Sequence, residues 1–218
     1  MAVFYNEETK TFYLEGKGIS YVFGINETNF PEHYYFGTRI GRDDLRYTTE
    51  HNIGDSAEAA LPGQVHAGGK SYNLYRSEFS VYGNGELREC SFAMLFGNGS
   101  RINDFNYETH EILPEKPAIS GMPSMRGGET LKLTLKDKNS EMRVHLFYTV
   151  YDDAAVVARR MEAENRTAES VKILRAYSFA LDVYGNDHDL LTLENAWARE
   201  NRPERTHLPH GTLMIDEK

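Results

Sequence analysis

Residues 129–135 read Glu-Thr-Leu-Lys-Leu-Thr-Leu, with a leucine at every second position from residue 131. This alternation predicts a half-buried strand, because successive side chains of a strand point to opposite faces of the sheet. The next apolar segment alternates in the same way and places Val144, Leu146, Tyr148 and Val150 on one face. Residues 137–140, Asp-Lys-Asn-Ser, lie between the two segments and are typical of a turn. The stretch 129–150 therefore predicts an antiparallel hairpin with one face in the core.

Further strand candidates occur at hairpin spacing on both sides of this hairpin. They are Ile19–Ile25, Ser91–Phe96, Ile102–Ile112, Ala155–Glu164 and Val171–Leu181. The alanine-rich segment Asp153–Ala163 suggests a helix, but it has little helical amphipathicity, so we expect a strand there as well. Together these patterns predict an all-β fold, a large antiparallel β-sandwich (a supersandwich) in one domain over residues 1–218.

Composition and charge exclude several classes of protein. The chain carries 24 Lys+Arg against 33 Asp+Glu, a net charge of -9, and no basic stripe that could neutralise phosphates. We therefore expect no nucleic-acid partner. The single cysteine, Cys90, cannot form an intrachain disulfide, which is typical of a protein of the reducing cytoplasm. Neither a leader-like N-terminal pattern nor an apolar run of about 18 residues occurs, so we expect neither export nor a membrane partner.

A search for catalytic motifs finds little. There is no Gly-x-Ser-x-Gly, no phosphate-binding loop and no dinucleotide fingerprint, so no cofactor is expected. His207-x-x-His210 is the nearest approach to a metal motif, and loop histidines are its simpler interpretation, so no metal is expected either. The acidic pairs Asp43-Asp44 and Asp152-Asp153 cannot place two carboxyls across a sugar, because neighbours point apart or into solvent. We expect no catalytic residue in this chain.

Aromatic residues and one glycine-rich segment are the remaining candidates for binding. Aromatic side chains make up 12% of the chain, and we expect most of them in the core, with the single tryptophan, Trp197, as a sugar platform or an interface anchor. Gly37–Gly69 has few apolar repeats, and it contains five glycines between Gly41 and Gly69. Because glycine loses much backbone entropy on ordering, we expect this long excursion to be poorly packed in the isolated chain.

Several segments, taken in order, resemble one known family. They are Tyr5–Leu14, Ile19–Val22, His33–Gly37, Tyr82–Arg88, Gly99–Phe105, Lys116–Pro123, Glu129–Leu131, Tyr148–Tyr151, Ser178–Asp182, Ala196–Glu200 and Glu204-Arg205. Their order and spacing resemble the N-terminal domain of the glycoside hydrolase family 36 α-galactosidases, from about Val3 to Gly211. One segment departs from the family: its usual Gly-Asp-Phe-Arg is Gly-Glu-Leu-Arg at residues 85–88 here.

The resemblance implies a retaining α-galactosidase that hydrolyses terminal α-galactosides of the raffinose or melibiose type. In that family two aspartates of a (β/α)₈ barrel, which follows the sandwich, perform the reaction. The barrel is not present in this chain, and the sandwich is itself expected to be truncated. The implied roles of this domain are structural support, formation of a homo-oligomer and shielding of the active site.

The family also places an acidic residue after the Tyr-Phe-Gly strand, where it reaches a galactose, often in a neighbouring subunit. The family's local pattern is not recognisable between Arg39 and Ala60, so the role is not carried over directly. Glu50 and Asp44 are the candidates for a sugar contact, with plain solvated loop acids as the alternative.

The sequence leaves two other functions open. A stand-alone carbohydrate-binding module would need an exposed aromatic platform. A sandwich enzyme of the aldose-epimerase kind would need a histidine base and a glutamate that meet in a pocket.

Overall fold

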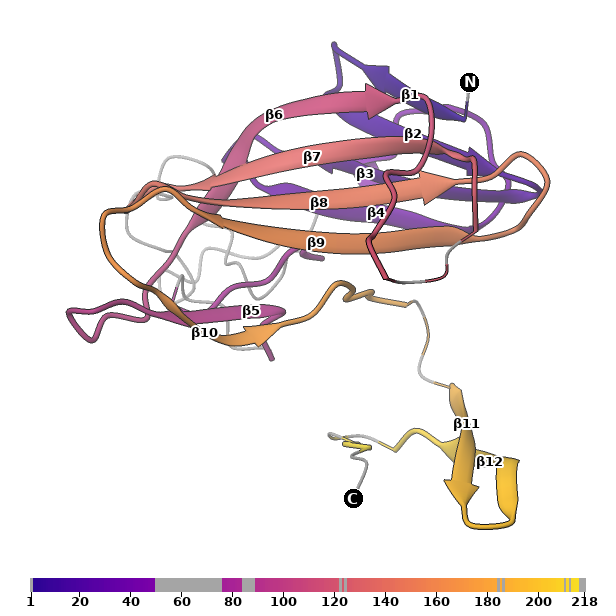
Figure 1. Ribbon diagram of the computed structural model, residues 1–218. Coiled ribbons are helices and arrows are strands. Elements are labelled where there is room, and N and C mark those ends of the chain that lie inside the picture. The colour runs from indigo at the N-terminus through magenta and orange to yellow at the C-terminus, as the bar shows by residue number, and fades with distance from the viewer. Residues whose placement is uncertain are drawn as a thin grey trace. The chain divides into compact units, whose positions relative to one another are not determined.

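Two four-stranded antiparallel sheets face each other in the computed structural model (Figure 1), which describes residues 2–49, 76–83, 89–121, 123, 125–183, 185, 187–209, 211 and 213–215. The first sheet has the order β1-β2-β3-β4. Its strands are β1 (Val3–Asn6), β2 (Thr11–Gly16), β3 (Ile19–Ile25) and β4 (Pro31–Thr38). Each strand pairs with the next along the chain, so the sheet is a meander of hairpins.

The second sheet has the order β6-β7-β8-β9 and contains the hairpin predicted from the sequence. Its strands are β6 (Phe105–Leu113), β7 (Glu129–Asp137), β8 (Met142–Val150) and β9 (Val157–Asn165). Leu133 pairs with Leu146 in the register of β7 and β8. Most of the alanine-rich segment lies in β9, so the prediction of a strand there, rather than a helix, is confirmed. The all-β, antiparallel expectation is therefore confirmed.

The core lies between the two sheets because the apolar alternation of each sheet faces the other. Phe12, Leu14 and Phe23 of the first sheet and Leu133 and Leu146 of the second are buried in one cluster. Each such side chain contributes about 1.5–3 kcal/mol through removal of apolar surface from water.

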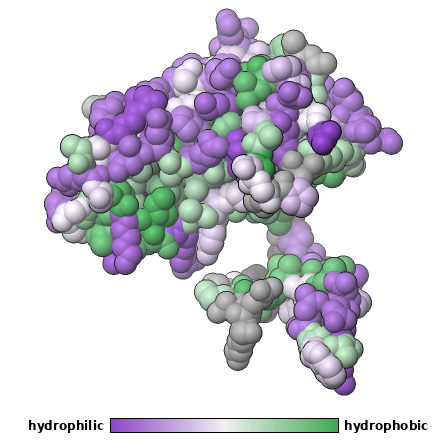
Figure 2. All heavy atoms as spheres, viewed as in Figure 1, coloured by the Kyte–Doolittle hydropathy of each residue, from purple (hydrophilic) through white to green (hydrophobic). Residues whose placement is uncertain are grey.

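Three smaller elements complete the described chain. β5 (Phe92–Leu95) pairs antiparallel with β10 (Lys172–Ala176), and η1 (Arg46–Thr49) is a single 3₁₀ turn. The predicted strand Val171–Leu181 is thus shorter than expected, because the chain leaves the pair with β5 after residue 176. Apolar side chains gather over β5 and β10 in Figure 2, and Ile173, Leu174 and Tyr177 are exposed there.

Residues Val183–Lys218 form a second compact unit. It is a hairpin of β11 (Asp189–Ala196) and β12 (Arg199–His207). Trp197 lies in its two-residue turn and is 96% exposed, so it is not a core residue of this unit. No helix among the described residues has the length and apolarity to cross a membrane.

Candidate functional site

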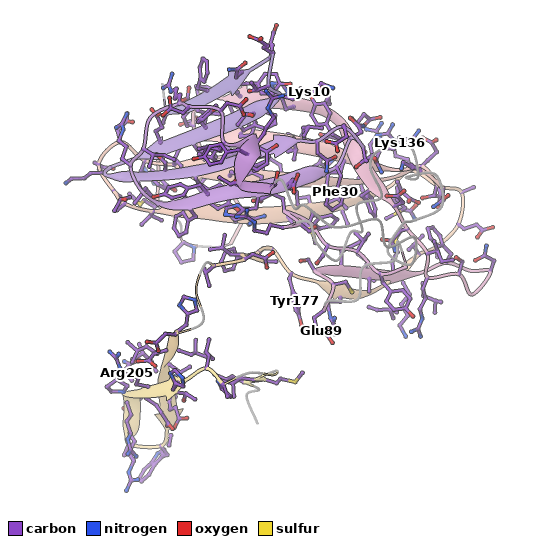
Figure 3. The ribbon with its side chains drawn as sticks, turned by 180° about the vertical axis from the view of Figure 1, so that it is seen from behind. Lys10, Phe30, Glu89, Lys136, Tyr177 and Arg205 are labelled. Carbon is purple, nitrogen blue, oxygen red and sulfur yellow. The ribbon has the colours of Figure 1, made fainter. Side chains whose placement is uncertain are left out.

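The outer face of the first sheet carries a second apolar cluster. Tyr13, Val22 and Tyr34 project from β2, β3 and β4, and Leu45 packs on them from the segment that follows β4. Figure 3 shows η1 lying across this face of the sheet. The Tyr13 hydroxyl donates a hydrogen bond to the carbonyl of Asp43 (2.7 Å), and the Ser20 hydroxyl accepts one from the amide of Ile40 (3.1 Å).

The first part of the excursion Gly37–Gly69 is therefore held against the sheet. Arg39 and Arg42 both bond to the Glu15 carboxylate, at 3.0 and 2.9 Å, and the Arg42 guanidinium lies 4.5 Å from the centre of the Phe4 ring. The hydrogen bond from Arg42 holds the pKa of Glu15 below its ordinary value. Poor packing was expected for the whole segment. It is wrong for Leu45 and Thr49, which are buried, and for Arg39 and Arg42, which find an ionic partner on the sheet, whereas Tyr47 is 66% exposed. Residues 50–69, including Glu50, lie outside the described residues.

Gly24 of β3 makes room for the Tyr34 ring on the neighbouring strand. A Cβ atom at residue 24 would lie 2.5 Å from the Tyr34 hydroxyl and 2.7 Å from its ring. Tyr34 is only 2% exposed, and its ring packs with Tyr13, Val22 and Leu45. The glycine thus fixes the position of a tyrosine at the base of the candidate site.

We expect Gly24→Ala to lower the free energy of unfolding by about 1–3 kcal/mol, because the added methyl group overpacks the Tyr34 ring. Urea unfolding measures this change. Gly97→Ala is a matched control, because its Cβ would meet only the end of the Glu169 side chain, at 3.2 Å. Equal unfolding free energies for the two variants would contradict the packing argument.

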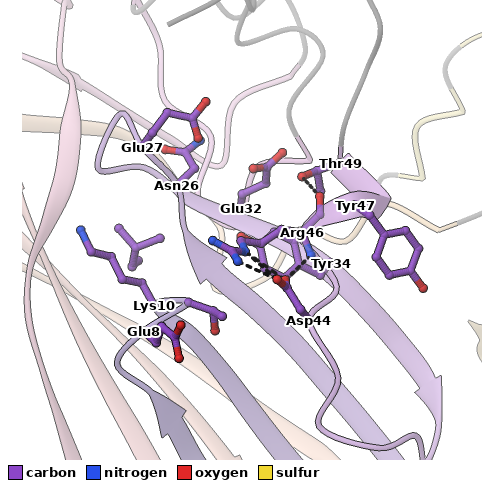
Figure 4. Close-up of a pocket in the computed structure, with 12 residues that line it drawn as sticks. Glu8, Lys10, Asn26, Glu27, Glu32, Tyr34, Asp44, Arg46, Tyr47 and Thr49 are labelled. Atoms are coloured by element: carbon purple, nitrogen blue, oxygen red, sulfur yellow. Dashed lines mark hydrogen bonds and ion pairs between the residues drawn. The ribbon is translucent and has the colours of Figure 1, made fainter.

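A pocket of about 610 Å³ opens beside η1 on this face (Figure 4). Three turns that are distant in sequence build it: the β1–β2 turn, the β3–β4 turn and the segment 44–49. Its lining residues are Glu8, Thr9, Lys10, Ile25, Asn26, Glu27, Glu32, Tyr34, Asp44, Arg46, Tyr47 and Thr49. The lining combines carboxylates, cations, an amide and tyrosine rings.

Asp44, one of the two acids singled out from the sequence, lines this pocket. Its carboxylate bonds to Nε and Nη2 of Arg46, with the shortest distance at 2.6 Å. The hydrogen bonds from Arg46 hold the pKa of Asp44 below its ordinary value. The pair fixes Asp44 as an ionised hydrogen-bond acceptor at the rim.

A buried ionic cluster lies within the sandwich, and none of its members lines the pocket. Glu78 is 2% exposed, and its carboxylate accepts hydrogen bonds from the hydroxyls of Tyr21 (2.7 Å) and Tyr148 (2.9 Å). His33 Nδ1 lies 2.7 Å from the same carboxylate, and Arg159 Nη2 lies 3.3 Å from it. Arg159 also bonds to both tyrosine hydroxyls and to the carbonyl of Ala180. The cluster joins β3, β4, β8 and β9 to the segment that contains Glu78.

This cluster keeps the Glu78 carboxyl ionised. Burial alone would raise its pKa, but the charge of Arg159 and the hydrogen bonds from His33 and Tyr21 outweigh burial and lower the pKa to about 2. Burial raises the pKa of the Tyr21 and Tyr148 hydroxyls, so both remain donors.

The lowered pKa of Glu78 predicts a loss of stability in acid. The folded-state value, about 2, lies below the ordinary 4.5, so between these values the unfolded chain binds more protons. The stabilisation is therefore complete above about pH 4.5 and disappears as the pH falls towards about 2. Carbon-13 NMR titration of the Glu78 carboxyl measures its pKa directly. A midpoint near the ordinary glutamate value would contradict this assignment.

The His33–Glu78 pair also bears on the reading as an aldose-epimerase-like enzyme. A histidine and a glutamate do meet, but both are buried, and neither lines the pocket beside the first sheet. The burial and the mutual contact of the two side chains are typical of a structural ion pair.

The other described residues singled out from the sequence are not among those that line the pocket. His207 contacts Asp189 at 3.2 Å in the β11–β12 hairpin, and His210 lies outside the described residues. No group of three or more metal-binding side chains occurs among the described residues. Asp152 and Asp153 are exposed in the turn after β8.

The sequence analysis missed Asn26 and the whole Glu78 cluster. The sequence did hold a signal for Arg159. It lies midway between Val157 and Met161, at a spacing of two residues from each, on the side of β9 that faces the core. A charge at such a position indicates a buried partner. No such signal exists for Glu78. Phe79 and Val81 alternate with Glu78 and Ser80, so the sequence alone predicts that Glu78 lies on the solvent face.

Comparisons with known proteins agree with this fold. Residues 29–218 match the family model described as the Glycosyl hydrolase family 36 N-terminal domain. The chain is 32% identical over 225 residues to α-galactosidase AgaA of Geobacillus stearothermophilus, covering 100% of this chain and 30% of the relative. It therefore spans about three tenths of the length of that relative.

Solved structures give the same result. The crystal structure of the family 36 α-galactosidase AgaB from Geobacillus stearothermophilus has a TM-score of 0.85 at 31% identity, over 97% of this chain and 29% of that chain. A structure of an AgaA variant in complex with raffinose has a TM-score of 0.84 at 31% identity, over 93% of this chain and 28% of that chain. The chain belongs to the N-terminal domains of glycoside hydrolase family 36.

Proposed function

We propose that this chain is the N-terminal domain of a retaining α-galactosidase that hydrolyses terminal α-galactosides of the raffinose or melibiose type. The match over residues 29–218 carries the proposal, because it places nearly the whole chain in one position within enzymes of about three times its length. The barrel that follows in such enzymes would supply both catalytic aspartates. In this proposal the chain itself is not catalytic.

The proposed roles of the domain are support of the barrel, shielding of its active site and formation of a homo-oligomer. Exposed apolar side chains on β10 support a role in association, because such surface is costly to leave in water. Trp197 is a second candidate anchor, since large aromatic residues dominate many interfaces. Asp44 and Glu50 are the proposed contacts to a galactoside, and a cytoplasmic location accords with the free, buried Cys90.

The test is to read the gene beyond codon 218 and to express the extended protein. The proposal predicts a (β/α)₈ barrel with two aspartates and hydrolysis of raffinose or melibiose. A stop codon directly after residue 218, or a downstream domain of another class, would refute it.

A stand-alone carbohydrate-binding module is the second candidate function. The pocket beside η1 favours it, because its volume suits a sugar and its lining is polar. The same reading of the gene separates the two candidates, since a module of this kind would not require a barrel.

A further inference from the structure

The pocket beside η1 contains a buried amide whose orientation is fixed. Asn26 is 8% exposed, and its Oδ1 accepts hydrogen bonds from the amide of Thr28 (3.1 Å), the hydroxyl of Thr28 (2.8 Å) and the amide of Phe30 (3.0 Å). These donors identify the oxygen of the carboxamide without ambiguity. The other end of the group is therefore the NH₂ donor.

That donor has no hydrogen-bond partner among the described residues. Asn26 Nδ2 is buried and forms no hydrogen bond in the described structure, and the same holds for the hydroxyl oxygen of Thr9, another lining residue. A buried polar group without a hydrogen bond costs about 1–3 kcal/mol. Because buried polar groups are rarely left without a hydrogen bond, these two call for a partner from outside the chain, such as water or a ligand.

Charged groups with unused hydrogen-bonding capacity surround the same space. Arg46 engages Asp44 through Nε and Nη2, which leaves Nη1 without a hydrogen bond in the described residues. Lys10 and Glu8 also line the pocket, and neither side chain has an ion pair in the part of the chain described (Figure 4). The pocket thus offers donors and acceptors within one space.

We infer that this pocket binds one unit of a neutral sugar through residues of this chain alone. The hydroxyls of a sugar both donate and accept hydrogen bonds, so they can satisfy Asn26 Nδ2 and Asp44 at once. An anion would be repelled by the lining acids Glu8, Glu27, Glu32 and Asp44, which outnumber the cations Lys10 and Arg46. The Tyr47 ring, 66% exposed at the rim, offers an apolar face for stacking.

The choice of a galactoside as the sugar rests on the proposed function, whereas the preference for a neutral polyol rests on the pocket lining. The proposed function and the assignment of the pocket can therefore be refuted separately. Hydrolysis by the extended protein would stand even if this pocket bound nothing, and binding of glucose in place of galactose would leave the pocket assignment intact.

The experiment is a titration of the full 218-residue chain with galactose, raffinose, glucose and glucuronate, followed by amide NMR and isothermal titration calorimetry. We expect saturable binding of the neutral sugars with Kd near the millimolar range, because one sugar unit offers few atoms for contact. We expect at least a tenfold weaker response to the anionic sugar. No saturable binding, or tighter binding of glucuronate, would overturn the inference.

Asn26→Asp locates the site, because it keeps the Oδ1 acceptor of the turn and replaces only the unpartnered donor with an oxygen. We expect it to weaken sugar binding at least fivefold. Asn98→Asp is the matched control: Asn98 Oδ1 also accepts a backbone amide, from Ser100 (2.9 Å), and lies outside the pocket. Lys10→Ala, at an exposed position, is a second pocket variant that should fold normally. Unchanged binding in both pocket variants would overturn the assignment.

Discussion

Replacement of Glu78 by glutamine is expected to lower the free energy of unfolding by about 3–5 kcal/mol, because it leaves the buried Arg159 without its countercharge. The amide NH₂ of glutamine would also face the hydroxyl donors of Tyr21 and Tyr148, which now point at carboxylate oxygens. A domain of this size is stable by about 5–15 kcal/mol, so the loss is a large fraction of the total. Urea unfolding followed by circular dichroism measures it.

The matched control is Glu115→Gln, because Glu115 is exposed and the change has the same chemistry. A change within about 0.5 kcal/mol is expected there. If Glu78→Gln unfolds with the same midpoint and slope as Glu115→Gln, the cluster does not hold the two sheets together. If Glu78→Gln is too unstable to purify, Arg159→Lys tests the same cluster, since lysine keeps the charge but cannot bond to both tyrosines and Ala180 at once.

The central hairpin was predictable because its strands are half buried, and a half-buried strand has a period of two in its side chains. Strand β2 shows why other strands could not be predicted from alternation. Its residues are buried on both faces, since the segment 39–49 covers the outer face of the sheet, so no alternation remains in its sequence. Strand β12 was not predictable for the opposite reason. Its side chains are largely exposed, so its sequence shows no apolar alternation, and it is a strand because its backbone pairs with β11.

The candidate site could be predicted only in part. Asp44 was a candidate because the family places an acidic residue in the loop after this strand, although the local pattern itself is not recognisable here, and the structure places Asp44 among the residues that line the pocket. Asn26 was not a candidate, because nothing in Asn-Glu-Thr indicates that the amide of residue 26 is buried. The pocket needs three turns brought together by strand register, and register depends on contacts between residues that are far apart in sequence.

The purified chain is expected to hydrolyse a nitrophenyl α-galactoside no faster than a buffer blank. A retaining glycosidase needs two carboxyls about 5–5.5 Å apart on either side of the scissile bond, one as nucleophile and one as acid. Glu78 cannot act as the acid, because it is enclosed by Tyr21, Tyr148 and Arg159 and its pKa is lowered to about 2. Asp44 is held ionised by Arg46 at the rim of the pocket, so it is not a protonated acid either.

The assay compares the chain with the protein extended through the proposed barrel, at equal concentration and after circular dichroism has shown that the chain is folded. Under the proposed function we expect the extended protein to exceed the isolated chain by at least about 10⁶-fold, the lower range of enzymatic rate enhancements, because the barrel would supply both aspartates. Turnover by the isolated chain that scales with its concentration, survives a second purification and falls in an Asp44→Asn variant would show that the sandwich itself carries the chemistry. Activity that disappears on purification would instead mark a contaminating hydrolase and leave the expected inactivity of the chain in place.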